Sequence, residues 1–319
     1  MIVILSTADD QSTTDVIRWL RYLEVPNDNI VRLNDSDKLL LERIEIREND
    51  IDIHLRILSN NRLITLCNTT SYWYRRGCWN LCTLKTGTKE LDAALSKEIK
   101  SVENFINNFL YRIPQRIGGF HENFLNKLTC LMIAQTVGLK IPQTLITTLK
   151  EFMNRDLRAS KAVSDIMQVE TEDGNYMGLG TVFLESELFN NAPDSFFPTL
   201  FQQYINKAYE LRIFYLHGKL WPMAIFSQNN EKTKIDFRNY DDEKPNRTVP
   251  YRLPAGIKKK LLLLMKQLKL TSGSIDMAVD CSGEFYFFEV NPIGQFSQVS
   301  LPCNYFLEKE IASYLSKSS

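Results

Sequence analysis

The sequence predicts a mixed α/β (α+β) fold, with a small N-terminal α/β domain followed by two further subdomains. Short apolar runs bounded by turn residues alternate with longer stretches whose apolar residues recur every three or four positions, and these patterns are typical of strands and helices. A chain of 319 residues is long for one small module and short for three independent domains. We therefore expect three closely packed subdomains, at residues 1–118, 119–205 and 206–319.

The composition excludes several classes of protein. Lysine plus arginine and aspartate plus glutamate both total 38, so the chain lacks the basic excess of a general nucleic-acid binder or of a protein drawn to anionic membranes. No stretch approaches 18 uncharged apolar residues, and the N-terminus has no basic segment typical of a signal peptide. The six cysteines are scattered, which favours free thiols in a reducing cytoplasm.

The first hundred residues have the pattern of an α/β unit. Ile2–Leu5 forms a short apolar run typical of a buried strand, and an amphipathic helix follows, capped within Thr13–Asp15 and ended by Pro26. Strand patterns recur at residues 29–33, 51–55 and 62–66, and a helical pattern covers residues 91–110.

The rest of the chain predicts helices at residues 123–137 and 258–269 and strands at residues 144–147 and 210–216. Gly138 is placed to end the first of these helices. His217-Gly218 forms the turn after the strand at 210–216, with Glu210 and Arg212 on one face of that strand.

A second hairpin brings oxygen-bearing side chains together. With a two-residue turn at Ser282-Gly283, Asp276 lies directly opposite Glu289, and strand alternation puts Asn291 on the same face. Two carboxylates facing each other across a sheet are unfavourable, but a divalent cation would reverse that sign, and hard oxygen ligands suit magnesium. The alternative is a solvated sheet face on which acidic residues happen to lie.

Several cations are candidates for anion binding. Lys127 lies on the helix at 123–137, and Lys161 lies in a mostly apolar context, where a lysine is a ready point charge for phosphate oxygens. Asp236 and Arg238 repeat the acid and arginine spacing of Glu210 and Arg212, although each pair could be an ordinary surface ion pair. Neither a Walker-type phosphate loop nor a Gly-x-Gly-x-x-Gly segment is present.

Together these segments match a known family pattern along essentially the whole chain. The segments that carry it are Tyr72-Trp-Tyr-Arg-Arg76, Asn126-Lys127, Ser160-Lys161-Ala162, Phe201-Gln-Gln-Tyr-Ile205, Glu210-Leu-Arg212, Asp236-Phe-Arg238, Gly273-Ser-Ile-Asp276 and Phe288-Glu-Val-Asn-Pro-Ile-Gly-Gln295. They resemble the ATP-grasp superfamily of carboxylate–amine ligases. Within it they are most similar to the microviridin-type graspetide synthetases, including the grasp-with-spasm peptide maturases.

The resemblance implies an ATP-grasp fold and the cofactors ATP and Mg²⁺. The residues that it assigns to the nucleotide are Lys127 and Lys161 at the phosphates, Gln203, Tyr204 and Ile205 at the adenine edge, and Glu210 at the ribose. It assigns magnesium to Asp276, Glu289 and Asn291, in agreement with the hairpin register. Arg212 and Arg238 are then the catalytic residues that stabilise the oxygens of the reacting phosphoryl group.

The expected function is that of a cytoplasmic ligase that macrocyclises a ribosomal precursor peptide, made of a leader and a core, through ω-ester or ω-amide links. The acids Glu170, Glu172 and Asp173 are candidates for leader binding. We expect a homodimer by the same resemblance. The alternatives are an ATP-grasp ligase that adds an amino acid to a protein or peptide terminus, and a catalytically idle domain that binds a leader peptide.

Overall fold

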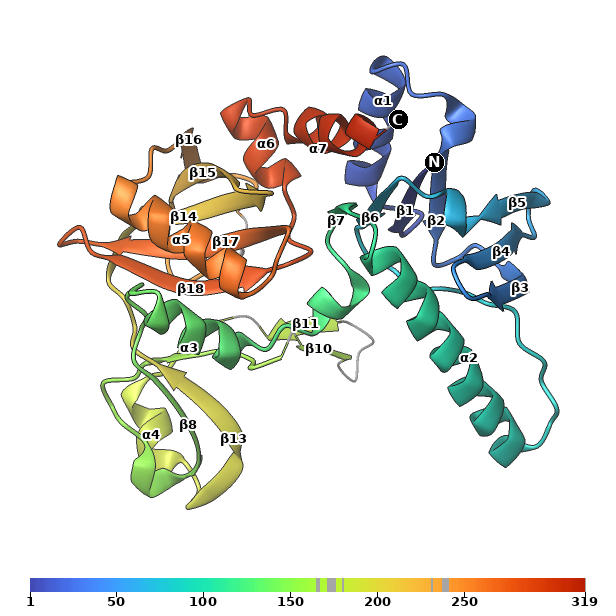
Figure 1. The fold of residues 1–319 in the computed structure, drawn as a ribbon. Helices are drawn as coiled ribbons and strands as arrows, with labels where there is room; N and C mark the ends of the chain where they lie inside the picture. The colour runs from blue at the N-terminus through green and yellow to red at the C-terminus, as the bar shows by residue number, and fades with distance from the viewer. Residues whose placement is uncertain (165–166, 171–175, 180, 231, 237–240, 319) are drawn as a thin grey trace. The chain divides into compact units, whose positions relative to one another are not determined.

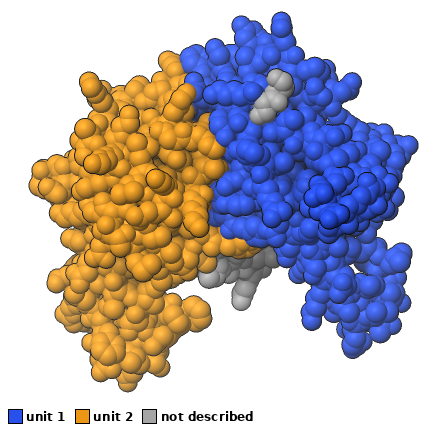
Figure 2. Space-filling model, viewed as in Figure 1, with its two compact units in different colours: residues 1–123, 295–300, 306–319 blue, residues 124–294, 301–305 orange. Residues whose placement is uncertain are grey.

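The computed structural model describes residues 1–164, 167–170, 176–179, 181–230, 232–236 and 241–318. The chain forms two compact units (Figure 2). Unit 1 comprises residues 1–123, 295–300 and 306–319, and unit 2 comprises residues 124–294 and 301–305. The three-subdomain boundaries expected from the sequence remain a prediction, but the return of residues near the C-terminus to unit 1 was not foreseen.

Unit 1 is built on a parallel sheet with the order β2-β1-β6-β7 (Figure 1). Its strands are β1 (Ile2–Ser6), β2 (Ile30–Asn34), β6 (Ser71–Tyr74) and β7 (Gln115–Ile117). All residues of β1 and β6 are buried, as is usual for parallel strands covered on both faces. Helix α1 (Gln11–Tyr22) follows β1, α2 (Lys89–Tyr111) connects β6 to β7, and α7 (Leu307–Leu315) packs against α1.

A second sheet of unit 1 is antiparallel, with the order β3-β4-β5. Its strands are β3 (Leu39–Ile46), β4 (Ile51–Ile57) and β5 (Arg62–Thr65). Short 3₁₀ turns occupy Asn27–Asn29, Leu66–Asn68, Phe120–Phe124 and Ser316–Ser318. Helix α6 (Ser297–Cys303) contains the point at which the chain passes from unit 1 back to unit 2.

Unit 2 contains an antiparallel sheet with the order β16-β15-β14-β17-β18. Its strands are β14 (Lys207–Leu216), β15 (Lys219–Phe226), β16 (Arg247–Pro250), β17 (Ser272–Asp280) and β18 (Phe285–Asn291). Helices α3 (Lys127–Thr136) and α5 (Ala255–Gln267) pack on one face of the sheet, where Leu131, Leu264 and Phe287 belong to one apolar core. The opposite face is therefore the one available to polar side chains.

The other sheet of unit 2 has the order β12-β9-β13-β8. Its strands are β8 (Thr144–Leu149), β9 (Ala159–Ser160), β12 (Val182–Phe183) and β13 (Ser195–Gln202), and α4 (Ser186–Asn191) precedes β13. Leu157, Leu184, Phe189 and Phe201 form its small core. A 3₁₀ turn covers Lys150–Phe152, and β10 (Met167–Glu170) pairs with β11 (Tyr176–Leu179).

The sequence patterns predicted, within a few residues, the elements β1, α1, β2, β4, β5, α2, α3, β8, β14, α5, β17 and β18. The cap of α1 is an exception, because Asp10 accepts from the amides of Ser12 and Thr13 and the helix begins before the expected Thr13–Asp15 segment. Strands β3, β6 and β7 and helices α4, α6 and α7 were missed. The expected turn at Gly138 is confirmed by its φ of +79°, which favours glycine. Within the described residues we find no helical segment whose length and hydropathy would suit a membrane crossing.

Candidate active site

The polar face of the five-stranded sheet carries charged residues from its three adjacent strands β14, β17 and β18. Leu211 and Ile213 of β14 belong to the apolar core, so alternation turns Glu210 and Arg212 to the opposite face, as the sequence predicted. In the sheet, Arg212 is the register partner of Asp276 on β17. Residues far apart in the sequence are thus adjacent on one surface.

Asp276 lies opposite Glu289 of β18, which confirms the predicted register at this position. The expected two-residue turn is wrong, because the strands pair as Val279 with Phe285 and leave a longer loop. A β-bulge corrects the offset: Met277 pairs with Phe287 and Asp276 with Glu289, so Phe288 is the surplus residue. The bulge keeps Phe287 in the core while Glu289 faces the charged surface.

Arg212 is bound to Asp276 by a buried ion pair. Its NH1 nitrogen lies 2.8 and 2.7 Å from the two carboxylate oxygens, and the residues are 7% and 7% exposed. The Nε of Arg212 has no hydrogen-bond partner among the described residues. Arg212 therefore neutralises the Asp276 carboxylate and fixes its orientation.

Glu289 gathers the two lysines that the sequence assigned to phosphate binding. Lys161, just after β9, places its Nζ 3.2 Å from Glu289 Oε2. The Nζ of Lys127 lies 4.0 Å from the same oxygen and donates to the carbonyl of Ser164 at 2.6 Å. Asn126 caps α3 and thereby fixes Lys127 as its first residue. The Glu289 carboxylate thus holds both lysines. The oxygens of an anionic ligand could compete with Glu289 for them.

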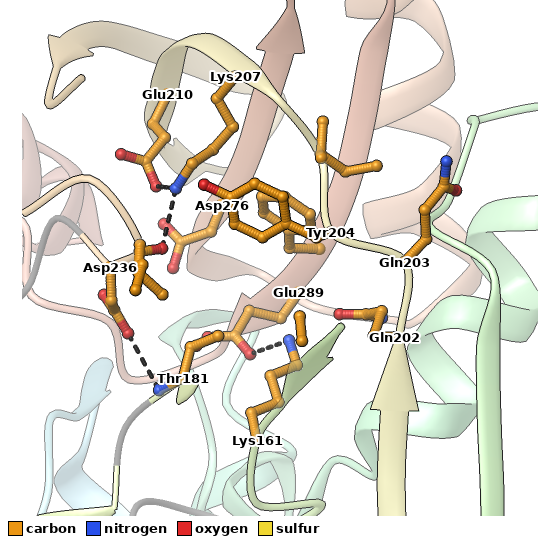
Figure 3. A pocket seen from close by; sticks show the side chains of 14 residues that line it. Lys161, Thr181, Gln202, Gln203, Tyr204, Lys207, Glu210, Asp236, Asp276 and Glu289 are labelled. Carbon is orange, nitrogen blue, oxygen red and sulfur yellow. Dashed lines mark hydrogen bonds and ion pairs between the residues drawn. The ribbon is translucent and has the colours of Figure 1, made fainter. Parts of the chain in front are cut away.

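These groups border a pocket that opens to solvent (Figure 3). Its lining includes predicted site residues from the five-stranded sheet and from segments that directly follow β9 and β13, which are Lys161, Gln203, Tyr204, Ile205, Glu210, Asp276 and Glu289. The segment 203–205 connects β13 to β14, and the amide of Gln203 is already bonded to the carbonyl of Gln143. Phe288 also lines the pocket beside Glu289, which the bulge allows for two consecutive residues.

Three predicted residues lie near this pocket but are not part of its lining. Lys127 reaches it through Glu289, and Arg212 through Asp276. Asn291 is exposed, and its Oδ1 accepts from the amide of Ile293 at 3.0 Å. Of the remaining candidates, Arg238, Glu172 and Asp173 lie outside the described residues, as does the side chain of Glu170.

The structure adds a buried lysine that the sequence analysis missed. Lys207 donates to Glu210 Oε1 at 2.7 Å and to the carbonyl of Ile235 at 3.0 Å (Figure 3). Ser227 donates to the other carboxylate oxygen, Glu210 Oε2. Burial raises the pKa of Glu210, although Lys207 and Ser227 oppose that rise. A bulge in β14 between Lys207 and Tyr209 breaks strict alternation, so strand spacing could not place Lys207 beside Glu210.

Asp236 is a second addition to the pocket. It is 5% exposed, lines the cavity and accepts from the amide of Thr181 at 3.4 Å. The sequence indicated Asp236 only by its spacing to Arg238. The negative charge of Asp236 also contributes to the raised pKa of Glu210.

The oxygen donors fit a magnesium ion that is shared with a phosphate ligand. Asp276 and Glu289 face each other in register, and Asn291 follows Glu289 on the same face. No cluster of three or more His, Cys, Asp or Glu suited to a metal occurs within the described ranges. Magnesium needs about six oxygens and is commonly held by one or two carboxylates plus substrate phosphates, so this donor set suits a nucleotide-bound ion better than an all-protein cage.

Solved structures with the same architecture span the whole chain. A RiPP-associated ATP-grasp ligase from Chryseobacterium gregarium, in complex with ADP and a leader and core peptide, is 24% identical, with a TM-score of 0.80 over 100% of this chain and 97% of that one. The chain has the ATP-grasp fold. The macrocyclase MdnC from Microcystis aeruginosa MRC, bound with precursor peptide MdnA, is also 24% identical, with a TM-score of 0.77 over 100% of both chains.

A more distant ATP-grasp structure is the ligase PsnB, complexed with a phosphomimetic variant of a minimal precursor, Mg and ADP. It is 14% identical, with a TM-score of 0.67 over 98% of this chain and 97% of that one. No protein-family model matches the sequence, and no curated protein matches it either. The predicted ATP-grasp fold is thus confirmed by structural similarity.

Proposed function

We propose that the protein is an ATP- and Mg²⁺-dependent, ADP-forming ligase that macrocyclises a ribosomal precursor peptide through side-chain ω-ester or ω-amide links. The observation that carries the proposal is the pairing of Asp276 with Glu289 at a pocket that also holds Lys161 and the 203–205 segment. A nucleotide site needs three kinds of group, and this pocket has them. The two carboxylates suit a metal ion, Lys161 suits phosphate oxygens, and the 203–205 segment suits the adenine base. The ATP-grasp fold supports this assignment.

The charges of the pocket suit a magnesium nucleotide. Lys161 and Lys127 are held by Glu289, and the lysine donors would turn to phosphate oxygens when these enter the pocket. Mg²⁺, when bound, would neutralise phosphate charge between Asp276 and Glu289. Glu210 would accept from the ribose hydroxyls, and the backbone of residues 204–205 would contact the edge of the adenine.

The reaction follows from a nucleotide held in this way. A substrate Asp or Glu carboxylate oxygen attacks the γ-phosphorus, the bond to the bridging oxygen breaks, and ADP leaves behind an acyl phosphate. A Ser or Thr hydroxyl, or a Lys amine, of the same peptide then attacks the acyl carbon and releases phosphate and a proton. Each link therefore removes one water from the peptide and consumes one ATP. The protein positions the groups and neutralises their charge.

The peptide substrate is the part of the proposal that rests most on similarity. The Chryseobacterium ligase and MdnC are both described with bound peptides, a leader and core peptide in the first and a precursor peptide in the second. We propose a precursor peptide of this kind as the substrate. Arg212 and Arg238 remain the proposed catalytic arginines, and the homodimer and the cytoplasmic location remain predictions.

Intact mass spectrometry tests the function directly. The purified protein is incubated with ATP, Mg²⁺ and a candidate precursor peptide encoded beside its gene, and ADP is quantified in the same samples. Loss of one water per ADP formed supports macrocyclisation, and Glu289→Gln should abolish both signals. Mass gain by an added amino acid would favour the alternative ligase, whereas absence of nucleotide binding would refute the proposal.

A further inference from the structure

Unit 1 contains an arginine pair at a position where α/β sheets commonly bind ligands. In the parallel order β2-β1-β6-β7, the chain leaves β1 toward β2 on one side and later returns as β6 on the other. The carboxyl ends of β1 and β6 therefore form a topological switch point, where open parallel sheets have a crevice for ligands. Arg75 and Arg76 directly follow β6 at this edge.

The two loops at this switch point are held in direct contact. The amides of Arg75 and Arg76 donate to the carbonyl of Leu5, at 2.9 and 3.2 Å. Gly77 comes next with a φ of +83°, and a Cβ there would lie 2.6 Å from the carbonyl oxygen of Ser6. Only glycine fits such an approach, so the backbone beneath both arginines is fixed.

The side chain of Arg75 is buried and makes contacts within the protein. It is 4% exposed, its Nε lies 3.0 Å from Asp10 Oδ2 and donates to Ser12 Oγ at 3.2 Å, and its guanidinium stacks over Phe296. Burial favours a neutral Asp10, but Arg75, Ser12 and Arg76 outweigh it and lower the pKa of Asp10. Asp10 is thus an ionised carboxylate that balances one guanidinium.

Arg76 is more exposed than Arg75, and its Nε forms no hydrogen bond with any described residue. Its side chain is 35% exposed, and its Nε lies 3.4 Å from Asp10 Oδ2 without forming a hydrogen bond. Arg76 is not needed to hold the loop after β1. Arg32 holds that loop by donating to the carbonyls of Thr7 and Asp10. One carboxylate facing two guanidiniums leaves a net positive charge beside the carboxyl ends of β1 and β6.

We infer that Arg76 binds a side-chain carboxylate of the peptide substrate, at a site formed by the loops after β1 and β6. The Nε of Arg76 lies beside the Asp10 carboxylate without bonding to it, and a guanidinium can bind a second carboxylate through two parallel N–H donors. This inference deepens the proposed function and rests on it, because acidic side chains are the groups that the ligase would activate or recognise. Arg76 is a binding residue by this inference, and Arg75 a positioning residue.

Nuclear magnetic resonance of the arginine Nε–H groups tests the site without requiring turnover. The full-length protein is titrated with a blocked tetrapeptide containing one glutamate, with its glutamine counterpart, and with inorganic phosphate. Arg76→Gln identifies the Arg76 signal by its disappearance. Arg18→Gln is the matched control, since Arg18 is a 67% exposed arginine of α1 that pairs with Asp15.

The glutamate peptide should shift the Arg76 signal and the glutamine peptide should not. Arg76→Gln should weaken binding of the glutamate peptide about tenfold, Arg76→Lys should weaken it less, and Arg18→Gln should leave it unchanged. Thermal melting of each variant shows that the loss is local. Equal binding by Arg76→Gln, or a stronger response to phosphate than to the glutamate peptide, would overturn the inference.

Nucleotide binding is measured in the same samples by adding MgADP. If MgADP binds and the glutamate peptide ignores Arg76, the carboxylate site fails and the proposed ligase stands. If the peptide responds to Arg76 but MgADP does not bind, the proposed function fails and the anion site at β1 and β6 remains without its catalytic context.

Discussion

Arg212 on β14 and Asp276 on β17 are register partners whose buried ion pair joins two strands 64 residues apart in the sequence. The arginine therefore lies directly behind a proposed magnesium ligand. In this position it fixes the direction of the Asp276 carboxylate, and a role at the reacting phosphoryl group would require Arg212 to use donors other than NH1. Removing Arg212 should then disturb folding as well as chemistry.

We predict that Arg212→Met destabilises the protein by about 3–5 kcal/mol, because it leaves the buried Asp276 carboxylate unpaired. Urea unfolding measures the loss. The double variant Arg212→Met/Asp276→Leu should recover most of it, since neither charge is then buried alone. Arg47→Met, in an exposed pair with Glu45, should cost far less than Arg212→Met. Equal costs for both single variants would contradict the argument.

Lys161→Met should weaken MgADP binding about tenfold or more, because one charge-assisted contact to phosphate is lost. Isothermal titration calorimetry provides the dissociation constants. Lys140→Met is the control, since Lys140 forms an exposed pair with Glu284 at the far end of β18. Unchanged affinity in Lys161→Met would remove Lys161 from the nucleotide site.

Glu122 should make the stability of the protein depend on pH. Burial raises its pKa from the ordinary 4.5 to about 7, although Arg116 lies 3.1 Å away and opposes the rise. Between these pH values the folded state holds a proton that the unfolded chain releases, so the free energy of unfolding falls as pH rises, by up to about 3 kcal/mol.

Urea unfolding at pH 4.5 and pH 7.5 tests the effect of Glu122. Glu122→Gln keeps the neutral form at both pH values, so its stability relative to wild type should rise with pH. Glu90→Gln, at an exposed position of α2 in the same unit, should follow the wild type. A constant difference between Glu122→Gln and wild type across this range would contradict a raised pKa.

Gly294→Ala should impair the proposed magnesium site from behind. A Cβ at Gly294 would lie 2.2 Å from Ser274 Cβ and 2.3 Å from its Oγ, so the segment that follows Asn291 must shift. We expect weaker Mg²⁺-dependent ADP binding, with partial recovery in Gly294→Ala/Ser274→Gly, where the Ser274 side chain is absent and only the backbone nitrogen, 2.9 Å from the added Cβ, still crowds it. Gly256→Ala, which meets open space, is the control. Failure of the second substitution to restore binding would show that the collision is not the cause.

The register of the carboxylates was predicted correctly, although two details of the hairpin between them were wrong. The sequence analysis placed Asp276 opposite Glu289 from a two-residue turn and uniform pairing, whereas the protein has a longer turn and a surplus residue, Phe288. The longer turn shifts the pairing by one residue, and the surplus Phe288 shifts it back, so Asp276 still faces Glu289. A bulge next to an apolar run has no distinct signature, since either Phe287 or Phe288 could enter the core.

Partners separated by long stretches of sequence were not predictable in this way. The pairing of Arg212 with Asp276 depends on the sheet order, and neither residue indicates the other. Lys207 was missed because a bulge moves it to the face of Glu210. The cap of α1 at Asp10 was missed because Thr13–Asp15, which lies next to the apolar pattern, also offers capping side chains.

The return of α7 to unit 1 bears on how the chain is made. Leu307, Ile311 and Leu315 are buried, and Ser71 of β6 donates to the carbonyl of Leu315 at 2.7 Å. At about 5–20 residues per second, a ribosome takes roughly 10 to 40 s to pass from the end of the first segment of unit 1 to α7. For that time the nascent N-terminal sheet lacks part of its cover, so its final packing awaits the late arrival of α7.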